Sequence, residues 1–239
     1  MQLKIVSWNI WCGKNLSQVI EFLRTANADL IGLQEVVQDM DGSNNSAEII
    51  AKELGYEYFF ARTCTLAPSQ ILPEIQKPVE WGNAILSKFP FEETKAHILS
   101  DTNIRIAVQA DIKAGDKTIH FFSTHLIHTH QQASEIQELQ AKNLVKIIPV
   151  QDSVVVGDFN ALPESNAIQI IHQTLKSADQ ALNQSTWSMD PNGCLVCNPH
   201  ELIAKLDYIF TSQNIKTIFF ETGKSHASDH VPIIGTIEV

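Results

Sequence analysis

Arginine is scarce in this 239-residue chain, which has only Arg24, Arg62 and Arg105. The fourteen lysines are scattered without a run or stripe, and the formal net charge is −10. Binding of duplex DNA usually rests on a basic face that contacts several phosphates. The composition therefore disfavours long duplex DNA as a ligand and favours single-stranded or small substrates. It is also compatible with a protein that chelates cations through carboxylates.

Long apolar runs and cysteines are also scarce. No stretch approaches the roughly 18 apolar residues that span a bilayer, and the opening MQLKIVSWNI looks like a strand instead of a signal peptide. We therefore expect a cytoplasmic protein. The four cysteines are too few for a disulfide scaffold. Cys194, Cys197 and His200 have the spacing of half a zinc site, but without a second half a loop is the simpler interpretation.

The hydrophobic content of 44% and the absence of a linker predict one globular domain over residues 1–239. Helical periodicity occurs around residues 17–26 with Ser17 as N-cap, at 46–54 before Gly55, at 131–148 and at 164–175. Residues 63–80, with three prolines, are predicted to form a long loop. Strand-like runs occupy residues 3–8, 30–36, 56–60, 83–87, 106–125 as a hairpin, 154–156, 206–210, 215–220 and 231–239. This pattern predicts two packed sheets covered outside by helices.

The first strand, helix and second strand form a unit that makes the two strands parallel. Their carboxyl ends then share one edge of a sheet, so we expect Asn9 and Glu35 to lie side by side.

Acids, amides and imidazoles interrupt the chain wherever a predicted strand ends or begins. Any one of them alone fits ordinary turn chemistry, but together they indicate a site. The residues are Asn9, Glu35, His125, Asp158, Asn160, Asp207, Asp229 and His230.

These residue types fit the hydrolysis of a phosphate ester. Mg²⁺ prefers one or two carboxylates, for which Glu35 is the best candidate. Asp158 is suited to align or deprotonate a water molecule, and the amide of Asn160 to hold a phosphate oxygen. His230 would stabilise the transition state if Asp207 fixed its tautomer.

The segments SWNI, LIGLQEV, WGNAILSKFP, STHL, VVVGDFN, LDYIF and SDH occur in this order over nearly the whole chain. They resemble the motif series of the endonuclease/exonuclease/phosphatase superfamily. The resemblance implies an α/β (α+β) fold, a four-layer α/β/β/α sandwich of two stacked mixed sheets flanked by helices. It also implies a site at one edge of the sheets and dependence on Mg²⁺ or Mn²⁺.

The resemblance also implies a role for each matching position. Glu35 would be the principal metal ligand with Asn9 nearby, and Asp229 a ligand of a second metal. The catalytic set would comprise Asp158, Asn160, His125, and His230 held by Asp207. Substrate contacts are expected from Asn9, Asn160, Asn83 and Trp187, with core packing as the alternative for Trp187 and the favoured role for Trp81. Glu80 is predicted to orient His125.

The leading functional prediction is a metal-dependent, endonuclease-like phosphodiester hydrolase without an obligate protein partner. A sphingomyelinase-like lipid phosphodiesterase and an inositol-type phosphatase are alternatives within enzymes, and an inactive phosphate-binding scaffold is an alternative of another class. No arginine follows STHL, where related hydrolases usually carry one, so the substrate contacts stay open. His128 and His130 are metal-ligand candidates, although solvated loop residues are the favoured interpretation.

Overall fold

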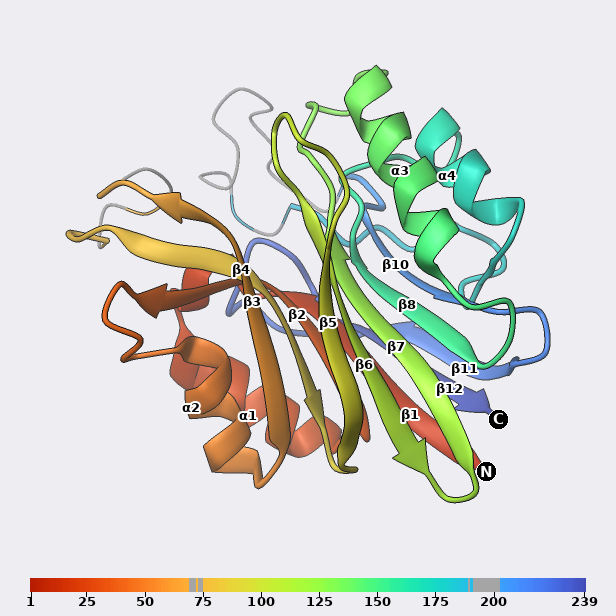
Figure 1. Ribbon diagram of the computed structural model, residues 1–239, viewed down its shortest axis with the longest axis horizontal. Helices are drawn as coiled ribbons and strands as arrows, with labels where there is room; N and C mark the ends of the chain where they lie inside the picture. The colour runs from red at the N-terminus through yellow and green to blue at the C-terminus, as the bar shows by residue number, and fades with distance from the viewer. Residues whose placement is uncertain (69–71, 73–74, 189, 191–202) are drawn as a thin grey trace.

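The computed structural model describes residues 1–68, 72, 75–188, 190 and 203–239. Two six-stranded sheets stack face to face (Figure 1). The first sheet has the order β11 (Lys216–Thr222), β12 (Ile233–Glu238), β1 (Gln2–Asn9), β2 (Leu30–Asp39), β4 (Val79–Ser87) and β3 (Glu57–Leu66). The second has the order β5 (Phe91–Ile98), β6 (Ile106–Ala114), β7 (Lys117–His125), β8 (Ser153–Asp158), β10 (Asp207–Thr211) and β9 (Lys176–Ser177).

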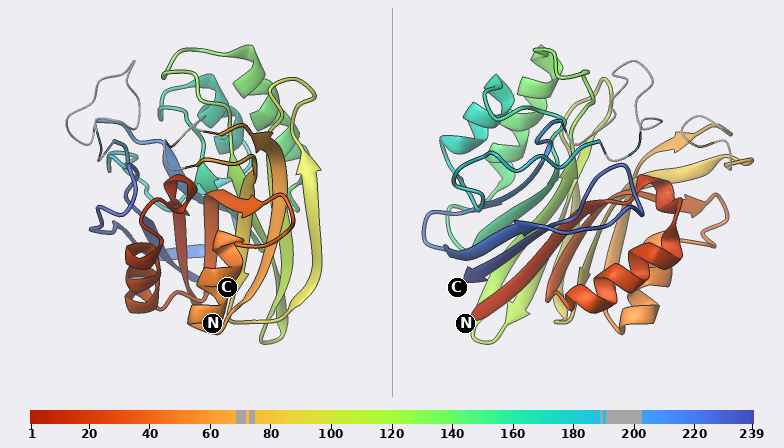
Figure 2. Two further views of the ribbon diagram at one scale, coloured as in Figure 1. Left: turned by 90° about the vertical axis from the view of Figure 1, so that its left-hand side faces the viewer. Right: turned by 180° about the vertical axis from the view of Figure 1, so that it is seen from behind.

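Two helices cover the outer face of each sheet, as Figures 1 and 2 show. Helices α1 (Leu16–Ala26) and α2 (Ser46–Leu54) pack on the first sheet, and α3 (Glu135–Ile147) and α4 (Asn166–His172) on the second. Three apolar clusters fill the spaces between the four layers, one between the sheets and one under each helix pair. The predicted four-layer α/β/β/α sandwich is confirmed.

The two sheets approach each other closely at Gly32 of β2. A Cβ atom at this position would lie 2.2 Å from Val156 Cγ2 on β8, which only glycine avoids. A polar link crosses at the same level, where Gln34 Nε2 donates to Ser123 Oγ of β7 at 2.9 Å. This contact fixes how β2 of one sheet lies against β7 and β8 of the other.

Strand direction brings the polar strand ends to one edge. Strands β1 and β2 are parallel and joined through α1, as predicted, and β7 and β8 are parallel and joined through α3. Strand β10 runs antiparallel to β8, so that Asp207 pairs with Asp158, and β12 runs antiparallel to β1. The ends of β1, β2, β7 and β8 therefore meet the starts of β10 and β12. The chain termini lie together elsewhere, where the amino group of Met1 donates to Val239 O (Figure 1).

Several predicted boundaries are wrong. The N-cap of α1 is Asn15 instead of Ser17, and its side chain donates to Ala227 O. Helix α3 begins at Glu135 instead of residue 131, because Ser134 is the N-cap and its hydroxyl accepts from Gln137 N.

The predicted long loop, the helix over residues 164–175 and the set of predicted strands also differ from the structure. Strands β3 and β4 extend into the predicted loop over residues 63–80, ending and starting at Leu66 and Val79. The helix predicted over 164–175 is confined to α4, and strand β5 was not predicted. Within the described residues, no helix is both long and apolar enough to cross a membrane. Cys194, Cys197 and His200 lie outside the described residues.

Candidate active site

A β-bulge aims Glu35 into the site. The pairing of β2 with β4 shifts register between Leu33 and Val36, and Glu35 has a φ of 56°. A bulge re-aims a side chain, and left-handed backbone at a non-glycine residue is strained and concentrates at functional sites. Asn9 Nδ2 donates to Glu35 Oε1 at 3.1 Å, so the predicted neighbours at the ends of β1 and β2 are in contact.

Glu35, which is half-buried, and Asp229, which is buried, are carboxylates near enough to interact electrostatically. Burial and the charge of Asp229 raise the pKa of Glu35 to about 7. Asp229 is itself held by two donors, Trp187 Nε1 at 3.1 Å and Ser228 Oγ at 3.2 Å. Two neighbouring carboxylates are a donor set suited to a hard divalent cation, because the cation would neutralise the negative charge of both.

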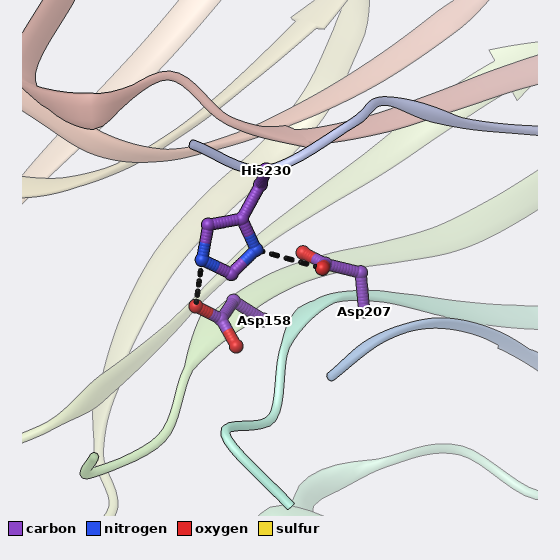
Figure 3. A group of neighbouring side chains, drawn as sticks. All are labelled: Asp158, Asp207 and His230. Carbon is purple, nitrogen blue, oxygen red and sulfur yellow. Dashed lines mark hydrogen bonds and ion pairs between the residues drawn. The ribbon is translucent and has the colours of Figure 1, made fainter. Parts of the chain in front are cut away.

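A second acidic cluster consists of Asp158, Asp207 and His230, shown in Figure 3. Their ligand-type atoms all lie within 4.8 Å of one another, a spacing compatible with a metal ion. His230 Nδ1 lies 2.8 Å from Asp207 Oδ2, and Nε2 lies 3.5 Å from Asp158 Oδ2 (Figure 3). Burial lowers the pKa of His230, but Asp207, Asp158 and Asp229 outweigh it and hold the pKa well above its usual value. An imidazolium has no lone pair for a metal, so this cluster is suited to proton and charge placement, and Glu35 with Asp229 to the cation.

Asp158 is the central carboxylate of the site. Its Oδ1 accepts from the backbone N–H of Asn160 at 2.9 Å, and its Oδ2 accepts from Asn9 Nδ2 at 3.1 Å. Burial raises its pKa, and His230 opposes this shift. Through Asn9, this carboxylate is also linked to Glu35, so the acids of both sheets belong to one hydrogen-bonded group.

A row of hydrogen bonds runs from His125 through Asn160 to His128. Asn160 Nδ2 lies 2.9 Å from His125 Nε2 and donates to Leu126 O, while Asn160 Oδ1 lies 2.8 Å from His128 Nδ1. Burial, with Arg105 and His230 nearby, lowers the pKa of His125 well below its usual value. His125 is therefore a neutral acceptor from Asn160, and its 3.5 Å approach to Asp158 is not an ion pair.

Two residues of the site were not predicted from sequence. His128 is half-buried and hydrogen-bonded to Asn160, so the favoured interpretation as a solvated loop residue is wrong for it. The exposed His130 places its Nδ1 atom 3.1 Å from His128 Nε2. The guanidinium of Arg105, just before β6, lies 5.1 Å from the centre of the Trp81 ring. Burial lowers the pKa of Arg105, and the charges of Cys64, Glu35 and Asp158 oppose this shift. The scarcity of arginine was the signal that could have singled it out.

Three predicted roles are not supported by these contacts. The prediction that Glu80 orients His125 is wrong, because Glu80 accepts from Gln38 Nε2 at 2.9 Å and lies 3.4 Å from Arg62. Successive side chains of a strand face opposite sides, and it is the next residue, the buried Trp81, that contacts the His125 ring. Core packing of Trp81 is confirmed.

The other two unsupported roles are the substrate contacts predicted for Asn83 and Trp187. Asn83 is fully buried and donates to Ile106 O, so it joins β4 to β6 and cannot reach a substrate. Trp187 is 2% exposed and packs against Ala204 and Leu206, which leaves no face for stacking. Its indole N–H instead holds Asp229.

The chain is thus a four-layer α/β/β/α sandwich in which acids, amides and imidazoles converge at one edge of the two sheets. The sequence profile of the endonuclease/exonuclease/phosphatase family matches residues 6–230, so the chain belongs to this family. Family members are hydrolases that act on phosphoester bonds. Among curated proteins, none matches the sequence.

Solved structures show the same fold at low sequence identity. An endonuclease/exonuclease/phosphatase from Beutenbergia cavernae superposes with a TM-score of 0.83 at 18% identity, covering 100% of this chain and 72% of the other. The human Nocturnin catalytic domain gives 0.72 at 17% identity, covering 99% and 94%. A mannosyl-6-phosphatase from Bacteroides thetaiotaomicron gives 0.70 at 16% identity, covering 99% and 100%. At these identities the likeness establishes the fold alone.

Proposed function

We propose that this protein is a phosphodiester hydrolase that depends on Mg²⁺ or Mn²⁺ and acts on nucleic acid or a small phosphodiester. The observation that carries the proposal is the buried row Asp207–His230–Asp158, in which His230 is hydrogen-bonded to Asp207 and lies within ion-pair distance of Asp158, with the carboxylates of Glu35 and Asp229 nearby. Such a line places a base and a cationic donor a few ångströms apart, which displacement at phosphorus requires.

A bound divalent cation would supply charge neutralisation at the phosphate oxygens, with Glu35, Asp229 and Asn9 as the residues able to hold it. Asp158 accepts a proton from the attacking water as the new P–O bond forms. His230, kept protonated by Asp207, stabilises the charge that develops on phosphorus-bound oxygen while the bond to the leaving oxygen breaks.

The amides and the arginine position the phosphate in this scheme. Asn160 is held by four hydrogen bonds, to Asp158, His125, Leu126 and His128, which fix the position of its amide beside Asp158. Arg105 supplies the nearest guanidinium, and a guanidinium binds phosphate oxygens in a fixed fork geometry. Arg105 would therefore supply the phosphate contact for which the segment after STHL carries no arginine.

Hydrolysis of two chromogenic esters tests the proposal. The chelator-treated protein is assayed on bis-p-nitrophenyl phosphate, a diester, and on p-nitrophenyl phosphate, a monoester, before and after Mg²⁺ or Mn²⁺ is added. We expect diester cleavage that appears only with metal. Cleavage of the monoester alone would favour a phosphatase. No cleavage of either would favour the inactive phosphate-binding scaffold, and headgroup release from sphingomyelin vesicles together with weak diester cleavage would favour the lipid enzyme.

A further inference from the structure

A cavity of about 230 Å³ opens directly beside Asn160. Its walls come from the loop over residues 129–134, the first turn of α3 and the segment 160–167 that leads into α4. Whole small-molecule pockets usually measure roughly 300–1,000 Å³. The cavity is therefore large enough for one part of a substrate, a group attached to the phosphate that Asn160 would orient.

The lining of this cavity exposes more apolar than polar surface, and its described residues carry no positive charge. Its inner side is apolar, with Ala161 and Ala167 buried, while Ser134, Asn166, Glu138 and Glu164 add hydroxyl, amide and carboxylate groups. None of its described lining residues is lysine, arginine or aromatic. A second phosphate would meet two carboxylates and no cation there, so the cavity disfavours the neighbouring phosphate of a nucleic-acid strand.

A quaternary ammonium group also fits poorly. Recognition of such cations relies on the faces of aromatic rings, which the described lining does not offer. A neutral ring with several hydroxyl groups matches better. Its C–H face would lie on the alanine side chains, and its hydroxyls would meet the surrounding amides and carboxylates.

The loop that forms one wall of the cavity also carries a donor without a hydrogen-bond partner. In the described part of the chain, Gln131 Nε2 is buried without a hydrogen-bond acceptor. Gln131 and the preceding His130 both have left-handed backbone, with φ of 59° and 49°. A buried donor left unpaired is costly, so a turn of the Gln131 side chain toward the cavity, where its amide could donate to an oxygen of a bound group, would be favourable.

We propose that this cavity binds a neutral, hydroxyl-rich group of the size of one sugar ring, joined through an ester to the phosphate at the catalytic site. The proposal rests on the phosphodiesterase activity proposed above and specifies its substrate class. The substrate is then a small phosphodiester of a sugar or polyol, with a single phosphorus atom, instead of a polynucleotide.

Three diesters with the same leaving group test this assignment. They are glucose 6-(p-nitrophenyl phosphate), its hydroxyl-free counterpart cyclohexylmethyl p-nitrophenyl phosphate, and p-nitrophenyl phosphorylcholine. Because ring size and leaving group match in the first two, their kcat/KM ratio isolates the hydroxyl groups. We expect the glucose ester to exceed the cyclohexylmethyl ester at least about tenfold, the equivalent of one or two hydrogen bonds.

A larger side chain at the rim of the cavity provides a second test, measured by the same ratio of kcat/KM values. Ala133 is exposed at the rim, so Ala133→Trp should narrow the cavity and lower the glucose-to-cyclohexylmethyl ratio about tenfold. Ala96→Trp, on the exposed face of strand β5, is the matched control and should keep the wild-type ratio.

Each outcome decides the matter. Equal rates for the two ring esters, a preference for the choline ester, or an unchanged ratio in Ala133→Trp would overturn the cavity assignment and leave the phosphodiesterase intact. Failure of the wild type to cleave any of the three esters with metal present would overturn the proposed activity, and the cavity assignment with it.

Discussion

Replacing Asp158 by asparagine should separate catalysis from stability. The substitution keeps the size of the side chain and the acceptor for the backbone N–H of Asn160, 2.9 Å away. It removes the base that takes the proton from water and the negative charge 3.5 Å from His230 Nε2. Loss of a general base costs about 10²- to 10⁴-fold in rate, or roughly 3–5 kcal/mol at 1.36 kcal/mol per tenfold.

The same substitution has opposing effects on stability. Burial raises the pKa of Asp158, so the charged carboxylate is unfavourable in the fold and its removal relieves that cost. The lost bond from Asn9 Nδ2 costs about 1 kcal/mol. For a chain of this size 1 kcal/mol shifts Tm by about 2–4 °C, so Tm should stay within a few degrees of wild type.

Metal-saturated turnover of bis-p-nitrophenyl phosphate and thermal unfolding are the two assays. Asp116→Asn, at an exposed turn, is the matched control and should alter neither. The expected result is a fall of at least about 10² in kcat with KM nearly unchanged. Asp158→Asn with near wild-type kcat would refute the role of Asp158, and a large loss of Tm would show that the carboxylate is structural.

Three further predictions follow from the charges around the site. Asp207→Asn removes the anion 2.8 Å from His230, lowers the pKa of His230, and should move the alkaline fall of kcat/KM down by roughly one to three pH units; an unmoved profile would contradict the pairing. Glu35 has its pKa raised from 4.5 to about 7, so in metal-free protein its contribution to stability is present below pH 4.5 and is lost as pH rises through 7, by up to about 3 kcal/mol. Metal-free Glu35→Gln should therefore unfold at a higher temperature than wild type at pH 8 but not at pH 5, and should need more Mg²⁺ for activity, as thermal scans and metal titrations would measure. Arg105→Gln should raise KM at least about tenfold through the lost phosphate contact, and an unchanged KM would remove Arg105 from the substrate site.

The sequence was sufficient to predict the architecture and the grouping of the acids. The strand–helix–strand unit places Asn9 and Glu35 at one edge, because parallel strands share their carboxyl ends, and the polar residues at the other strand ends indicate that Asp158 and Asp207 join them. The short helix-start pattern Ser134–x–x–Gln137 was present as well, and would have corrected the start of α3.

Contacts that depend on side-chain direction could not be predicted from sequence. The bulges in the pairing of β4 with β2 and β3 fix which residues face His125, so Glu80 turns away and Trp81 turns inward. The sequence did not predict strand β5, because β5 is an edge strand in which most residues are exposed, several are charged, and apolar and polar residues alternate little. Arg105 enters the site from a different sheet than Glu35, a proximity that arises only from the packing of the two sheets.

The most direct test of the central claim compares wild type with His230→Gln on bis-p-nitrophenyl phosphate at saturating Mn²⁺. His230 lies between Asp207 and Asp158, and the account makes its protonated ring essential to the transition state while assigning the metal to other residues. It therefore predicts a loss of at least about 10² in kcat with Mn²⁺ affinity little changed. A variant that keeps wild-type kcat, or that loses activity only because it no longer binds Mn²⁺, would contradict the account.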